Sequence, residues 1–392
     1  MSDWKEYKLG DVCSDINYGY TASANNNPIG PKFLRITDIV PERINWETVP
    51  YCEINKGNEK KYKLEKGDIV IARTGATTGY NAIIKGATHA VFASYLIRYR
   101  VKNEIANPFY IGYLLKSYEW KGFVQNVMSG SAQPGANAKQ FADFDFELPP
   151  YQLQDEIVSI LSSLDDKIDL LQRQNKTLEQ LAETLFRQWF VEEAEESWEM
   201  VKVSDFAYIN KLTVSRNYPF TVIEYLDTGS ITEGVIENFE TYNLSDAPSR
   251  AQRIVKDNDI VYSLVRPIQR HYGLLNNVKE NTVVSTGFCV ITSKRISQYF
   301  LYLLLTRNDA IDYFDMIAEG STSAYPSLKP SDIAKFEFKK PPEEKLNKFN
   351  KVSSDTLNKI KSNTHQIKSL TQLRDALLPK LMSGEMRVKN NN

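Results

Sequence analysis

The chain has 392 residues, of which 42% are hydrophobic, which is enough for two or three domains with buried cores. It has no run of 18 apolar residues, and residues 1–10 are polar and charged, so we expect neither a membrane span nor a secretory leader, and a cytoplasmic location. The formal net charge of −1 excludes a strongly basic protein, so any nucleic-acid binding must rest on local patches or on partner subunits.

The cysteines and histidines do not form a chemical site. Cys13, Cys52 and Cys289 lie far apart and include no CxxC pair, so we expect neither a disulfide framework nor a zinc site. The three histidines, His89, His271 and His365, are isolated and lack the spacing of metal ligands. We therefore expect no metal. We also expect no cofactor, because no glycine-rich fingerprint for S-adenosylmethionine is present and the glycines at 75–79 lack the Gly-Lys-Ser/Thr of a P-loop.

The sequence pattern of residues 1–148 predicts a compact α+β domain. Short β-rich runs such as Ile69–Ala72, Ala82–Ile84 and Tyr95–Val101 are separated by Gly and Asn turns. Pro149 and Pro150 then stop the last strand and provide a rigid start for a helix.

Residues 149–197 predict a long amphipathic helix, in which nine of ten positions spaced alternately by four and three residues are apolar. We expect Asn175 to set the register of this seam, although it could instead face solvent at a loosened turn. Trp189 and Phe190 either cap the helix bundle or belong to a docking surface. The seam positions are Ile157, Leu161, Leu164, Ile168, Leu171, Asn175, Leu178, Ala182, Leu185 and Trp189.

The remainder of the chain repeats this unit with an offset of 190 to 194 residues. Trp4 returns as Trp198, the string at Gly67–Val70 returns as Asn258–Val261, and Pro149-Pro150 returns as Pro341-Pro342. A period of half the chain is too long for a solenoid, so we expect two copies of one unit. The second domain is then 198–340, and 341–392 hold the second helix and the C-terminal tail.

The two helices carry opposite charge. Residues 149–197 contain four basic and eleven acidic residues, and residues 341–392 contain ten basic and five acidic residues. Complementary charge beside an apolar seam favours pairing between the helices, and we expect an intramolecular antiparallel coiled coil with pseudo-two-fold symmetry. Two amphipathic helices packed separately on their own domains are the alternative. Adding 192 to each seam position of the first helix gives a weaker seam on the second helix. We expect this seam to include Ile360, Ile367, Leu370 and Leu377, together with polar residues such as Ser353, Thr356 and Asn363.

Over essentially its whole length the chain resembles the specificity subunits of Type I restriction-modification systems. The resemblance rests on the two-fold repeat and on the strings at 67–79, 130–134, 148–150 and 377–385, taken in this order. It implies a non-catalytic subunit in which each globular domain reads one half of a split double-stranded DNA target. It also implies that the helices set the gap between the halves and dock two methyltransferase subunits, which restriction and translocation subunits join.

Gly-rich loops carry the side chains that contact DNA best, because arginine and amide groups read base edges and hydroxyls bind phosphates. For any one of them a polar surface turn, whose glycines serve backbone geometry, is an equal alternative. The expected DNA-contacting residues are Tyr18, Tyr20, Thr21, Arg73, Thr74, Thr77, Thr78, Tyr80, Ser131, Gln133, Asn137 and Lys139 in the first domain, and Arg266, Gln269, Arg270, His271, Tyr272, Ser321, Ser323 and Tyr325 in the second.

Two other functions fit parts of the sequence. The string Leu148-Pro149-Pro150-Tyr151 resembles the Asp/Asn-Pro-Pro-Tyr motif of amino-methyltransferases, but Leu148 replaces the polar residue that engages the target amine. A self-contained DNA methyltransferase with degenerate motifs is thus one alternative, and binding of its cofactor would distinguish it. A coiled-coil protein scaffold explains the helices but not two unequal copies of a Gly-rich domain.

Overall fold

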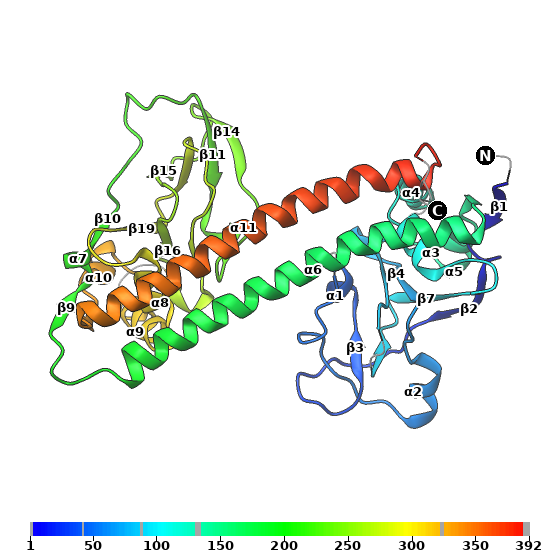
Figure 1. The fold of residues 1–392 in the computed structure, drawn as a ribbon, viewed down its shortest axis with the longest axis horizontal. Coiled ribbons are helices and arrows are strands. Elements are labelled where there is room, and N and C mark those ends of the chain that lie inside the picture. Colours follow the sequence, from blue (N-terminus) through cyan, green and yellow to red (C-terminus); the bar gives the residue numbers. More distant parts are fainter. Residues whose placement is uncertain (1–2, 41–42, 87–88, 130–134, 322–324, 387–392) are drawn as a thin grey trace. The chain divides into compact units, whose positions relative to one another are not determined.

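The computed structural model describes residues 3–40, 43–86, 89–129, 135–321 and 325–386. These residues form two compact units that divide the chain within its two long helices, α6 (Tyr151–Arg187) and α11 (Glu343–Met382). Unit 1 comprises residues 1–170 and 366–392, and unit 2 comprises residues 171–365. In Figure 1, unit 1 begins in blue, α6 is green and α11 runs from orange to red.

Unit 1 is built around an antiparallel sheet with the strand order β2-β7-β4-β5. A parallel pair, β3 with β6, and an antiparallel pair, β1 with β8, complete its strands. The strands are β1 Lys5–Lys8, β2 Cys13–Tyr18, β3 Lys32–Leu34, β4 Asp68–Ala72, β5 Asn81–Ile83, β6 Ala90–Phe92, β7 Leu96–Val101 and β8 Asp145–Leu148. The helices before α6 are α1 Ile36–Ile39, α2 Lys56–Tyr62, the 3-10 turn η1 Gly75–Thr77, α3 Pro108–Leu114, α4 Tyr118–Ser129 and α5 Ala138–Ala142.

Unit 2 repeats this topology with additions. The order β10-β19-β16-β17 corresponds to the central sheet of unit 1, and the parallel pair β11 with β18 is extended on both sides by β14 and β15. The strands are β9 Met200–Lys202, β10 Ala207–Ile209, β11 Val222–Leu226, β12 Ile231–Thr232, β13 Val235–Ile236, β14 Glu240–Asn243, β15 Ala251–Ile254, β16 Ile260–Ser263, β17 Tyr272–Leu274, β18 Thr282–Ser285, β19 Phe288–Ser293 and β20 Glu337–Lys339. The helical elements besides the long helices are the π-helical turn η2 Gln188–Glu192, α7 Val203–Phe206, η3 Thr228–Ser230, η4 Pro267–Gln269, α8 Gln298–Thr306, α9 Asn308–Glu319 and α10 Pro330–Ala334.

The repeated sequence string before β4 and β16 has a local physical cause. Gly67 and Asn258 both adopt a positive φ, of 91° and 68°, and glycine and asparagine are the residues that tolerate this conformation best. The next residue in each copy is a buried aspartate that accepts a backbone N–H three residues earlier, at 2.8 Å in both units. The string therefore fixes the turn that starts the central buried strand of each domain.

The proline pairs act as predicted. Strand β8 ends at Leu148 and α6 begins at Tyr151, while β20 ends at Lys339 and α11 begins at Glu343. Proline lacks the N–H that a continuing strand needs and fits the first turn of a helix, where that donor is not required.

The positions predicted to form the seam of α6 are covered by other parts of the protein. All ten are buried or half-buried, and the ten positions 192 residues later on α11 are too. These positions include polar residues such as Ser353, Thr356 and Asn363, which are at most 6% exposed. The three-four spacing thus predicted which face of α11 is inward, even where the residues themselves are polar.

Within each unit the two helices run antiparallel. In unit 1, Ile157 and Leu161 of α6 share a core with Leu381 and Met382 of α11, and Asp165 pairs with Arg374. In unit 2, Asn175 bonds Asn363 at 2.8 Å, and Glu193, just beyond η2, pairs with Lys345 at 3.1 Å. Contacts that move forward along one helix thus move backward along the other, and the alternative of two helices packed separately is wrong.

The helix pair is also part of each domain's core. In unit 2, Phe186, Phe190 and Phe349 surround Phe300 of α8, with ring centroids 5.0 to 6.3 Å apart. Phe190 therefore lies in the core, which supports the first of the two roles considered for it. The buried seam residues therefore leave little surface for a partner subunit, and their part in subunit docking stays a prediction.

Three further observations concern the described residues as a whole. No helix there combines the length and apolar character that crossing a membrane requires. No cluster of three or more His, Cys, Asp or Glu side chains in those ranges is arranged to hold a metal ion. The three cysteines are unpaired and buried, and burial raises the pKa of the Cys52 thiol to about 11.

Candidate nucleic-acid interface

Each domain places two of the predicted loops side by side. In unit 1 the loop after β4 lies against the segment before α5, because the Ala136 N–H donates to the Arg73 carbonyl at 3.0 Å and Thr74 bridges Gly135. In unit 2 the Leu328 N–H donates to the Leu264 carbonyl at 2.7 Å, and Val265 bridges Ser327. We call each arrangement a two-loop platform: residues 73–80 with 135–139 in unit 1, and residues 264–271 with 325–328 in unit 2.

Arg73 is held in place at the platform of unit 1. Its Nε donates to the Ser94 carbonyl at 3.0 Å, and its guanidinium lies 5.1 Å from the centroid of the Tyr18 ring. The Tyr18 hydroxyl in turn accepts the Ala138 N–H at 3.0 Å, which links the arginine to the second loop. A guanidinium stacked on an aromatic ring has a defined orientation, which suits it to paired hydrogen bonds with a base or phosphate.

Arg266 has a comparable support in unit 2. Its guanidinium lies 5.5 Å from the centroid of the Tyr325 ring. The backbone N–H of Arg266 donates to the Pro326 carbonyl at 3.0 Å. Arg266 and Arg270 both adopt positive φ angles, of 46° and 58°, on either side of η4. Such angles are unfavourable for arginine and persist only where the surrounding structure imposes them, which is common at functional loops.

Arg270 and His271 are largely engaged within the protein. The Arg270 guanidinium donates to Glu233 at 3.2 Å and to Asn308 at 2.9 Å, while the Nδ1 of His271 lies 2.6 Å from the Ile231 carbonyl. These two side chains position the loop rather than extend from it.

The other expected residues divide by exposure. Thr78 and Tyr272 are 7% and 5% exposed, so they are structural; the Thr78 hydroxyl donates to the Gly75 carbonyl at 2.8 Å. Asn137 is exposed, but its side chain accepts the Gln140 N–H and caps α5. Tyr20 is half-buried against Tyr62. Ser131, Gln133 and Ser323 lie outside the described residues; the remaining expected residues, Thr21, Thr74, Thr77, Tyr80, Lys139, Gln269 and Ser321, are half-buried or exposed.

One exposed residue beside the first platform and one within the second were not expected from the sequence. Tyr95 is 58% exposed, and its carbonyl accepts the Arg73 N–H at 3.1 Å, so it borders the first platform. Ile268, in η4 of the second platform, is 53% exposed. Tyr95 begins a predicted strand, so the sequence did not mark it as a loop residue. Ile268 is apolar and does not match the residue types expected to contact DNA. Only the exposure of the two side chains identifies them.

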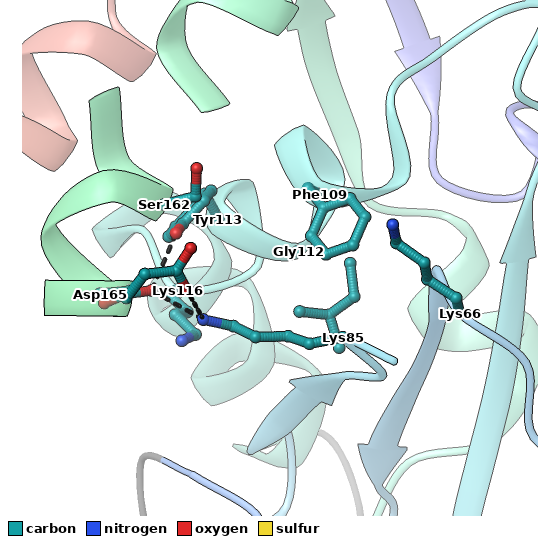
Figure 2. Close-up of a pocket in the computed structure, with 10 residues that line it drawn as sticks. Lys66, Lys85, Phe109, Gly112, Tyr113, Lys116, Ser162 and Asp165 are labelled. Carbon is teal, nitrogen blue, oxygen red and sulfur yellow. Dashed lines mark hydrogen bonds and ion pairs between the residues drawn. The ribbon is translucent and has the colours of Figure 1, made fainter. Parts of the chain in front are cut away.

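A second polar site joins the first domain to the helices of unit 1. Asp165 of α6 accepts the Tyr113 hydroxyl at 2.8 Å and an Arg374 N–H at 3.1 Å, and Lys85 lies 3.7 Å away. Figure 2 shows Tyr113 and Lys85 directed at this carboxylate. All three side chains line a cavity of about 210 Å³.

Burial by itself would raise the pKa of the Asp165 carboxyl. The hydrogen bond from Tyr113 and the positive charges of nearby lysine and arginine side chains outweigh burial, and the pKa is lowered. Asp165 is therefore an ionised anchor between the domain and both helices, and its neighbours account for its charge without a catalytic role.

Comparison with known proteins places the chain in a family. Residues 1–180 and 195–374 match the family described as the Type I restriction modification DNA specificity domain. The chain is 24% identical to the Type I restriction enzyme HindI specificity subunit of Haemophilus influenzae, over 98% of this chain and all of that one. It is 26% identical to the MjaIX specificity subunit of Methanocaldococcus jannaschii, over 83% of this chain and 78% of that one.

The fold has a solved counterpart. The crystal structure of a Type I restriction-modification system S subunit from M. genitalium superimposes with a TM-score of 0.59 at 13% identity, and covers 99% of this chain and 97% of that one. The predicted α+β fold, with two similar domains and two long helices, is thereby confirmed. With two matched domains covering most of its length, the chain belongs to the Type I restriction-modification DNA specificity family and is a specificity subunit of that class.

Proposed function

We propose that the two-loop platforms each read one half of a split double-stranded DNA target. The observation that carries this proposal is the repeated platform itself: each unit presents an arginine supported by a tyrosine ring, Arg73 on Tyr18 and Arg266 on Tyr325. Arginine with paired donors is the most frequent reader of guanine in the major groove. The platforms differ in sequence, so the two half-sites differ as well.

The long helices set the gap between the half-sites in this proposal. A helix of about 40 residues is roughly 60 Å long at 1.5 Å per residue, which exceeds one ~34 Å turn of DNA. A helix pair with a buried seam resists bending, so the distance between the two platforms becomes part of the specificity.

The chain supplies recognition, and other subunits supply catalysis. Two methyltransferase subunits dock on the helices, and restriction and translocation subunits join them in the full complex. The exposed leucines of the helices, Leu170 and Leu373 in unit 1 and Leu181 in unit 2, are 48 to 51% exposed and offer apolar contacts to such partners. Partner subunits add phosphate contacts to those that local patches of this chain make, since its net charge is only −1.

The test is an exchange of the second domain. The full chain is co-expressed with a methyltransferase subunit, and the modified bases of the host DNA are mapped by long-read sequencing. We expect a split motif, one half of which changes when residues 198–340 are replaced by those of a relative. A motif that changes in both halves, or in neither, would contradict the assignment of one half-site to each domain.

The same experiment tests the alternative of a self-contained methyltransferase. If the chain expressed alone methylates DNA, or binds S-adenosylmethionine, the recognition subunit is the wrong assignment. We expect neither result.

A further inference from the structure

The first loop of the second platform carries an exposed aliphatic side chain, Ile268, in the 3-10 turn η4. Ile268 is 53% exposed, whereas its neighbour Pro267 is buried and anchors the loop to the domain. A single exposed isoleucine is ordinary on a protein surface. The conformation that presents Ile268 is not ordinary.

Several interactions hold the loop in that conformation. Arg266 and Arg270, which flank η4, are two of the six non-glycine residues with positive φ in the described chain, and this conformation is unfavourable for arginine. The Gln269 N–H donates to the Arg266 carbonyl at 2.9 Å, and the Ile268 N–H donates to Asp315 of α9 at 3.3 Å. The fold thus accepts strained backbone to keep this loop, and Ile268 with it, in one position.

The neighbours of Ile268 indicate what it contacts. Arg266 and Gln269 are exposed on either side, and their side chains are the ones that bind guanine and adenine edges in the major groove. Among the groups on base edges in that groove, the 5-methyl of thymine is the apolar one. An aliphatic side chain between two base-reading side chains is therefore suited to an apolar contact with the 5-methyl group of thymine.

We propose that Ile268 contacts the 5-methyl group of a thymine in the half-site read by the second domain. This inference rests on the proposed function and adds one specific base contact to it. Since the contact is apolar, it discriminates thymine from a base of the same hydrogen-bonding pattern that lacks the methyl group.

Deoxyuridine provides the test, because it pairs as thymidine does and lacks only that methyl group. The full chain, assembled with its methyltransferase subunit, is titrated with duplexes that carry the mapped motif and a single deoxyuridine at each thymidine in turn. We expect one position in the second domain's half-site to weaken binding by the wild-type complex roughly fourfold, the value of about one buried methyl group.

Two variants complete the experiment. Ile268→Ala should bind the thymidine duplex and that deoxyuridine duplex equally, because the methyl group has lost its partner. Val222→Ala, which shortens an aliphatic side chain that is 40% exposed on β11, should keep the wild-type difference.

The proposal is overturned if that half-site contains no thymine, if no deoxyuridine position weakens wild-type binding, or if the loss persists in Ile268→Ala. Each of these results leaves the split motif intact, and so spares the proposed function. Absence of any split motif would instead overturn the proposed function itself.

Discussion

At the scale of single residues, polar side chains in this protein are divided between recognition and support. Arg73 and Arg266 are oriented by tyrosine rings, whereas Arg270 and Asn137 are engaged within their own domains. In the sequence, both sets are polar side chains on similar loops and cannot be told apart. Only the partners that the fold gives each side chain separate them, so the interface is defined by the platforms and not by residue type.

Asp165 allows a test of the junction in unit 1. The pKa of Asp165 is lower in the folded protein than in the unfolded chain, where it is near 4. The ionised carboxylate therefore stabilises the fold above pH 4, and this stabilisation is lost as the pH falls through the folded-state pKa. We expect Asp165→Asn to lower the free energy of unfolding by about 2 kcal/mol at pH 7, because Arg374 and Tyr113 lose a charged acceptor. At pH 3 the difference from wild type should shrink. Urea unfolding at both pH values measures it.

Asp166→Asn is the matched control, because the Asp166 side chain is 71% exposed and should matter little at either pH. A difference between Asp165→Asn and wild type that stays the same from pH 7 to pH 3 would show that ionisation of Asp165 does not stabilise the junction.

At the scale of elements, the helix pair contains a buried contact between two asparagine side chains in its seam. Asn363 is fully buried, and its Nδ2 donates to Asn175 at 2.8 Å and to Gln174 at 2.9 Å. Its Oδ1 has no hydrogen-bond partner among the described residues. A pair of this kind lowers stability but opposes other registers, since a shift would bury an asparagine against apolar side chains.

Replacing both asparagines tests this role. We expect Asn175→Leu/Asn363→Leu to raise the free energy of unfolding by about 1 kcal/mol, because apolar pairs replace an incompletely bonded polar one. Either single variant should lower it, because an asparagine then faces a leucine. Denaturant unfolding of the three variants and wild type gives the comparison. A double variant less stable than both single variants would mean that the amide contact is strongly stabilising.

At the scale of the whole molecule, both long helices contribute to both compact units. Leu171, where α6 passes from one unit to the next, is 3% exposed. A proline in a helix interior removes a backbone hydrogen bond and destabilises the helix by about 3 kcal/mol or more. The domains themselves do not depend on this one turn, because each has its own core.

Leu171→Pro therefore separates domain folding from helix continuity. We expect hydrogen exchange of the core strands to show that both domains remain folded. Methylation of the motif with a single spacer length should be lost, or should occur at motifs with several spacer lengths. Leu171→Met, which conserves volume, should retain the wild-type motif. If Leu171→Pro still methylates the same motif with one spacer, the helices do not set the distance between the half-sites.

The sequence by itself determined the duplication, the two α+β domains, the helix starts and the seam, because these follow from local rules. The Pro-Pro pairs, the three-four spacing and the Gly67 and Asn258 turns depend on neighbours within a few residues. The seam even assigned Asn363 to the inward face, through its offset from Asn175.

Only the tertiary structure decided which loop residues are free to act. Tyr272 and Arg73 were both expected to contact DNA because each lies on a polar loop. Tyr272 is buried in a core, whereas the Arg73 guanidinium lies over the Tyr18 ring. Tyr95 and Ile268 became candidates only once their exposure was known. Exposure and partners depend on segments far apart in the chain, such as Arg73 with Ala136 and Leu264 with Leu328, and no local pattern encodes those contacts.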